Sequence, residues 1–99
     1  TLFIDDILLI ESFGRKLFFR LVQNKEEENS MYGKLDEVEK ELSKYGFIRI
    51  QKSYLVNAKY IKSINSSEIS LVNGLELKIG RIKYTDVKEK CLEYKGDMW

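Results

Sequence analysis

The chain has 99 residues, of which 43% are hydrophobic and 33% charged, and its formal net charge is +1. That length suits one domain with one modest core, and no apolar run is long enough to span a bilayer. The sequence has no histidine and a single cysteine, Cys91, which excludes histidine-dependent triads, histidine- or cysteine-rich metal sites and an intrachain disulfide. We therefore expect one domain over residues 1–99, without cofactor or metal, in the cytoplasm.

Short apolar segments at the start of the chain predict strands. Ile7–Ile10 is almost wholly apolar, as in a buried strand. A polar turn at Ser12–Lys16 separates it from a second strand at Leu17–Gln23. Asn24–Lys25 suits a hairpin turn, after which Glu28–Tyr32 is a candidate third strand.

The segment 33–45 changes to the period of a helix. Leu35, Val38 and Leu42 recur at spacings of three and four residues, which places one apolar stripe on an otherwise charged helix. Gly46 stands where the glycine that ends a helix is expected. Because the stripe is narrow, we expect this helix to cover a sheet. Its acidic outer side would repel phosphate, so we do not expect a recognition helix.

The chain then returns to short strands. We expect strands at Phe47–Ile50 and Tyr54–Val56, joined by the polar turn Gln51–Ser53. Ala58–Tyr60 suits one helical turn, and Ile61–Ile64 suits a further strand. Asn57, between strand and helical turn, is interpreted as a cap or turn residue.

A hairpin and a helix complete the pattern. A three-residue hairpin loop, Val72–Gly74, with its glycine in the left-handed region, keeps the apolar residues of both strands on one face, whereas a two-residue loop would mix the faces. From about Lys83 the period is helical again, with Val87 and Cys91 on the apolar side. We expect a mainly β, antiparallel fold with a mid-chain helix and a C-terminal helix. The residues on the common face of the hairpin are Ile69, Leu71, Leu75, Leu77 and Ile79.

The charges are distributed unevenly along the chain. Lys25–Lys44 carries seven acids and four lysines, whereas Gly46–Ile64 carries four bases and no acid. Lys78–Lys90 carries five bases and two acids. A basic surface built on strands is one characteristic of nucleic-acid-binding proteins.

The same basic stretch resembles a known family. Phe47–Asn57, with the sequence FIRIQKSYLVN, and Tyr60–Ile64 resemble the signature of LytTR domains, the DNA-binding output domains of LytR/AlgR-type response regulators. The similarity extends, in the same order, over nearly the whole chain. The other matching segments are Asp6–Glu11 with Gly14–Arg15, Gly33–Val38, Ile69–Gly74 and Leu77–Arg81.

The resemblance implies an elongated fold of several antiparallel sheets that lies along double-stranded DNA, with loops in two successive major grooves. It also implies a bacterial two-component transcription regulator that binds paired direct repeats as two domains side by side. An upstream receiver domain would control it. Thr1 stands in place of an initiator methionine, so we expect the chain to be the C-terminal effector part of a longer protein, with no membrane contact in this segment.

The resemblance places the DNA contacts in three loops. Arginine suits bidentate contact with guanine and glutamine suits adenine, whereas lysine and serine commonly bind phosphate. The family often has histidine, serine and tyrosine where this chain has Gln51, Gly80 and Lys83, so the family's sequence preference is not carried over. The expected contacts are Arg15 and Lys16 in the first loop, Gln51, Lys52 and Ser53 in the second turn, and Arg81 and Lys83 before the last helix.

Two other functions stay open. One is a protein-interaction or regulatory β module that does not bind DNA itself, and the other is a small-ligand sensor. An enzyme is not expected, because the sequence has neither histidine nor a glycine-rich phosphate loop such as GxxxxGK[ST].

Overall fold

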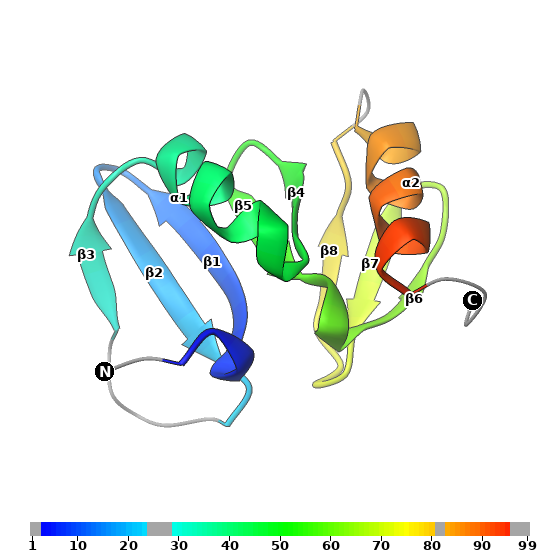
Figure 1. Cartoon of the computed structure of the whole chain (residues 1–99), viewed down its shortest axis with the longest axis horizontal. Helices are drawn as coiled ribbons and strands as arrows, with labels where there is room; N and C mark the ends of the chain where they lie inside the picture. The colour runs from blue at the N-terminus through cyan, green and yellow to red at the C-terminus, as the bar shows by residue number, and fades with distance from the viewer. Residues whose placement is uncertain (1–2, 24–28, 81–82, 96–99) are drawn as a thin grey trace.

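The computed structural model describes residues 3–23, 29–80 and 83–95. It contains two antiparallel sheets, one of five strands in the order β3-β2-β1-β5-β4 and one of three in the order β6-β7-β8 (Figure 1). The predicted mainly β fold with two helices is confirmed. The strands are β1 (Ile7–Phe13), β2 (Lys16–Leu21), β3 (Ser30–Tyr32), β4 (Phe47–Gln51), β5 (Tyr54–Asn57), β6 (Ile61–Ile64), β7 (Glu68–Leu71) and β8 (Glu76–Lys78). The helices are α1 (Leu35–Leu42) and α2 (Tyr84–Lys95), with 3-10 turns η1 (Ile4–Asp6), η2 (Ser43–Tyr45) and η3 (Ala58–Tyr60).

Two turns are tighter than the sequence pattern predicts. Phe13 pairs with Lys16, so the first turn is reduced to Gly14 and Arg15. Gln51 pairs with Tyr54 and is the last residue of β4. Polar side chains on an exposed face do not interrupt the backbone ladder, which explains why polarity alone overestimated both turns. The predicted hairpin turn at Asn24–Lys25 lies outside the described residues.

The core consists of two clusters on opposite faces of the five-stranded sheet. The larger cluster lies between this sheet, the three-stranded sheet and α2, and includes Leu9, Ile69 and Val87, each with no exposed surface. The smaller cluster lies under α1 and includes Leu35, with Val38 and Leu42 packed against it. The predicted apolar stripe of α1 is therefore confirmed.

The β7–β8 hairpin has the predicted three-residue loop. Ile69 pairs with Leu77, the Gly74 amide donates to the Leu71 carbonyl at 2.9 Å, and Gly74 has a φ of 90°. The Leu71 amide also donates to the Leu75 carbonyl at 2.8 Å, as the predicted pairing requires. Four of the five residues of the predicted common face are buried, whereas Leu75 is 37% exposed. Leu75 lies at the loop end of the hairpin, beyond the buried part of the sheet.

Two predictions about capping residues are also confirmed. Asn57 is buried, accepts the Lys59 amide at 3.1 Å as the cap of η3, and donates from Nδ2 to the Ile7 carbonyl at 3.0 Å. It therefore joins the end of β5 to the start of β1. Gly46 has a φ of 87° and ends η2. Within the described ranges, neither helix is long and apolar enough to cross a membrane.

Candidate nucleic-acid interface

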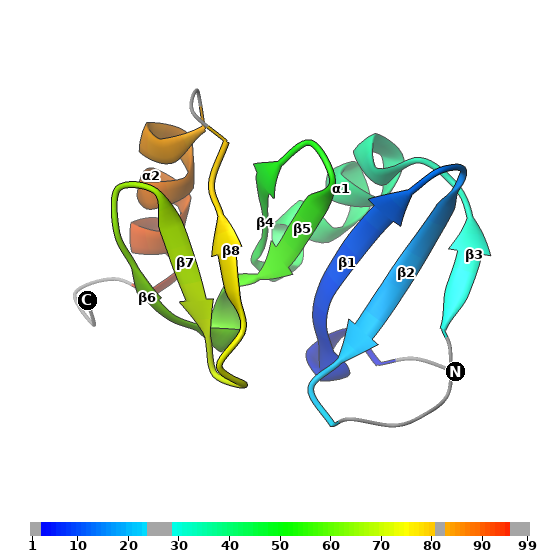
Figure 2. The ribbon, with the colours of Figure 1, turned by 180° about the vertical axis from the view of Figure 1, so that it is seen from behind.

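Three connections lie along one long edge of the molecule. The β1–β2 turn, the β4–β5 turn, and the end of β8 with the start of α2 follow one another along the upper edge in Figure 1, and the view from behind in Figure 2 shows the same order. The longest dimension of the molecule is 34 Å. These are the three places where the DNA contacts were predicted.

The β4–β5 turn, Lys52–Ser53, is held from inside by Arg49 on β4. The Arg49 guanidinium donates from Nε to the Gln51 carbonyl at 2.9 Å and from Nη2 to the Lys52 carbonyl. The turn carbonyls are therefore directed at Arg49. The Lys52 side chain remains exposed, and Ser53 is half-buried.

Arg49 is in turn held by two carboxylates of α1. Its Nη1 lies 2.8 Å from Oδ1 of Asp36 and 2.9 Å from Oε1 of Glu39. The hydrogen bond from Arg49, and then its charge, lower the pKa of Asp36 below its ordinary value. The Arg49 side chain is only 10% exposed and its charge is balanced by the two carboxylates, so little of that charge is presented to a ligand.

The β1–β2 turn is connected directly to the β4–β5 turn. The Ser12 amide donates to the Ser53 carbonyl at 2.8 Å, because β1 pairs with β5. Gly14 has a φ of 64°, a left-handed conformation that glycine adopts without strain. Arg15 beside it is exposed, whereas the Lys16 ammonium lies 5.4 Å from the centre of the Tyr32 ring.

A hollow of about 570 Å³ separates these two turns. Arg15, Lys34 and Lys52 line it, and none of the three forms a salt bridge with another described residue. The acid in the lining, Asp36, is paired with Arg49. The hollow therefore has an excess of unpaired positive charge and suits an anionic ligand.

The third connection is fastened to the end of β4. The Gly80 amide donates to the Ile50 carbonyl at 2.9 Å, and Gln51 Nε2 donates to the Lys78 carbonyl at 2.8 Å. The Lys83 amide donates to the Gly80 carbonyl at 2.8 Å, and Lys83 is exposed. Arg81, the predicted base contact, lies outside the described residues.

The sequence comparisons agree with this geometry. The sequence model of the LytTr DNA-binding domain matches residues 1–91. The chain belongs to the LytTr family. A solved LytTr DNA-binding domain, from a Bacillus cereus protein described as a methyl-accepting/DNA response regulator, is 26% identical with a TM-score of 0.72. That match covers 89% of this chain and 82% of the other. Among curated proteins no sequence matches significantly.

Membership of the LytTr family confirms the resemblance carried by the basic stretch and the segments around it. The TM-score shows that the solved relative has a fold similar to the one described above. LytTr domains are DNA-binding domains of response regulators, so the family is one of binding modules, not of enzymes.

Two features of this LytTr domain escaped the sequence prediction. The first is the ion pair of Arg49, which was counted from the sequence only as one of the basic residues. The available signals were its position before a polar turn and the presence of Asp36 and Glu39 on one face of a helix. Phe13 and Tyr32 are 74% and 73% exposed. Phe13 on β1 and Tyr32 on β3 are the cross-strand neighbours of Lys16 on β2. Two exposed aromatic rings therefore lie beside the first loop.

Lys59, another lysine of the basic stretch, does not lie on this edge. Lys59 lies in η3, at the opposite end of β5 from Lys52, about 13 Å away along the strand. Its ammonium lies 4.0 Å from Asp5 and 5.5 Å from the Tyr60 ring centre. Lys59 is therefore a suitable internal control for Lys52.

Proposed function

We propose that this LytTr domain binds double-stranded DNA sequence-specifically, as the output domain of a bacterial transcriptional response regulator. The observation that carries the proposal is that three connections with exposed basic side chains lie along one edge. Backbone hydrogen bonds join these connections to one another. The Ser12–Ser53 bond joins the first two, and the Gly80–Ile50 bond joins the last two. A ligand would meet them as one pre-arranged surface.

The length of the domain is comparable with one helical turn of duplex DNA. Successive major grooves on one side of B-DNA are about 34 Å apart, and the longest dimension of the domain is 34 Å. We assign the first loop and the third segment to neighbouring major grooves, and the β4–β5 turn to the intervening backbone. Family membership supports this arrangement through the DNA-binding role of LytTr domains.

The chemistry of the residues separates contacts with base edges from contacts that position the domain on the DNA backbone. Arg15 and Arg81 have the planar donors for bidentate contact with guanine. Gln51 is already hydrogen-bonded to the Lys78 carbonyl, so its role in this proposal is to hold the third segment in place. The phosphate contacts are assigned to Lys16, Lys52, Ser53 and Lys83.

The wider biological setting belongs to the same proposal. We infer an upstream receiver domain, paired direct repeats as the target, two domains side by side on DNA, and action in the cytoplasm. These inferences rest on the family and on the resemblance of the motifs. Analysis of the full-length regulator on duplexes with one or two repeats would test them.

The salt dependence of binding tests the DNA proposal. Affinity for a repeat-bearing duplex should fall steeply as salt rises, because phosphate contacts release counterions. Lys52→Ala should weaken binding to every duplex and reduce the slope of log affinity against log salt by about 0.9. Lys59→Ala, the same substitution at the far end of β5, should leave the slope unchanged.

The alternative of a protein-interaction module that does not bind DNA makes the opposite prediction. In that case affinity for any duplex stays weak and flat with salt. Equal effects of Lys52→Ala and Lys59→Ala would also contradict the proposed edge, because they would indicate a response to net charge alone.

A further inference from the structure

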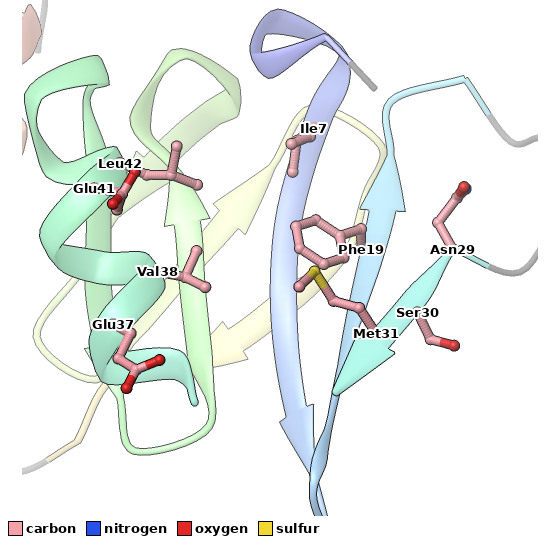
Figure 3. Close-up of a pocket in the computed structure, with 9 residues that line it drawn as sticks. All are labelled: Ile7, Phe19, Asn29, Ser30, Met31, Glu37, Val38, Glu41 and Leu42. Atoms are coloured by element: carbon pink, nitrogen blue, oxygen red, sulfur yellow. The ribbon is translucent and has the colours of Figure 1, made fainter. Parts of the chain in front are cut away.

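A second concave surface lies on the face of the five-stranded sheet that carries α1. α1 packs mainly against β4, β1 and β5, and a groove of about 630 Å³ separates it from β2 and β3 (Figure 3). Strands are spaced about 4.8 Å apart and a helix is about 10 Å wide. One short helix therefore covers only part of a five-stranded sheet, and the open part beside α1 is about as wide as another helix.

The floor of this groove is apolar. Figure 3 shows Phe19 and Met31 on the strand side and Val38 and Leu42 on the helix side, facing one another across the groove. Met31 is 53% exposed, which is unusual for a large apolar side chain. Methionine packs well against varied partners because its side chain is flexible and polarizable. Ile7 forms the end of the floor and is buried.

The rim on the helix side is acidic. Glu37 and Glu41 lie four residues apart on α1, so both are on the same face, about 6 Å apart. Both are exposed and line the groove, and within the described ranges neither forms a salt bridge. They differ in this respect from Asp36 and Glu39, which are paired with Arg49.

We propose that this groove binds an amphipathic, cationic helix of a partner protein. Its apolar face would lie on Phe19, Met31 and Leu42, and its lysines or arginines would meet Glu37 and Glu41. Charge complementarity selects a basic partner and disfavours an acidic one. A helix laid in an apolar groove is a common mode of peptide recognition, and here it would complete the helical layer over β2 and β3.

The groove is separate from the proposed DNA edge. The residues that line it and those that line the hollow between Arg15 and Lys52 are two distinct sets. The two surfaces also have opposite charge preferences. Each site can therefore be altered and tested without substitution of a residue that lines the other.

The test uses two synthetic peptides at least about 15 residues long, so that they form a helix. Both have leucines along one face, and the flanking residues are lysines in one and glutamates in the other. Binding of labelled peptide is measured by fluorescence anisotropy on the wild-type domain, on Glu37→Lys/Glu41→Lys and on the matched control Glu76→Lys/Glu89→Lys. The control changes net charge equally at exposed positions away from the groove.

The wild type and the control should prefer the lysine peptide, and the Glu37→Lys/Glu41→Lys variant should lose about tenfold in affinity for it. Met31→Asp, at an exposed position, should lose affinity for both peptides while duplex binding is retained. Equal losses in the control, or no binding of the lysine peptide to the wild type, would overturn the proposal. A concentration-dependent dimer abolished by Met31→Asp would overturn it in favour of a second copy as occupant.

Discussion

Two pairs of carboxylates on the same short helix face different environments. Asp36 and Glu39 are directed at Arg49, which holds the β4–β5 turn. Glu37 and Glu41 line the groove beside β2 and β3. The first pair is neutralised internally and supports a basic edge, whereas the second remains available to a cationic ligand.

The comparison shows why net charge along a segment is a poor guide to where a ligand binds. The acidic helix was predicted to repel phosphate, yet two of its carboxylates help to build the surface assigned to phosphate. Electrostatic effect depends on which charges are already paired, and pairing is a property of the folded chain.

Substitution of Arg49, the partner of Asp36 and Glu39, should have the largest effect on stability and on duplex binding. Arg49→Ala deletes the donors to two turn carbonyls, so the free energy of unfolding should fall by about 2 kcal/mol. Duplex affinity should fall about tenfold or more, because the turn that carries Lys52 loses its support. Urea denaturation and binding titrations measure the two effects. Arg49→Lys should show much of both, because a compact ammonium lacks the planar, spread donors of a guanidinium.

The salt slope separates this supporting role from direct contact. Suppose that Arg49→Ala leaves the free energy of unfolding unchanged and reduces the slope of log affinity against log salt by about 0.9, the value for one phosphate contact. Arg49 would then be a DNA ligand. Such a result would contradict the internal role assigned to it.

Arg15→Ala should weaken binding to the preferred duplex by about 1–2 kcal/mol and binding to other duplexes by less. The loss of a bidentate base contact should relax preference at one base position, as measured by selection from a randomised duplex pool. Lys34→Ala, which lines the same hollow, should weaken binding without a change in preference. An unchanged preference in Arg15→Ala would contradict base readout by this residue.

The smallest expected effect is on the pH dependence of stability. Because Arg49 lowers the pKa of Asp36 in the folded state, the carboxylate stabilises the fold above the ordinary carboxyl pKa of about 3.9, and this is lost as pH falls through the lowered value. The stability difference between wild type and Asp36→Asn should therefore shrink below about pH 4. Urea denaturation of both proteins across this pH range measures the difference.

The fold was largely predictable because its local signals agree with one another. The hairpin loop followed from the alternation between Ile69 and Leu77, and the cap role of Asn57 followed from its place between a strand and a helical turn. The exposure of Leu75 did not follow, because burial at the end of a hairpin depends on how far the other sheet extends.

The candidate site was predictable only in part. The three loops came from the resemblance to a family. The connection of the first two depends on pairing between β1 and β5, which brings together Ser12 and Ser53, 41 positions apart in the chain. The groove beside α1 had no local signal at all. It arises because α1 is shorter and narrower than the sheet it covers.

The most direct test of the DNA edge is amide chemical-shift mapping of the domain during titration with a repeat-bearing duplex. The proposed interface predicts that the largest changes occur at Arg15–Lys16, Gln51–Ser53 and Lys83, and that Glu41 and Leu42 in the groove are nearly unaffected. Changes centred on the groove, with the three connections unaffected, would contradict it.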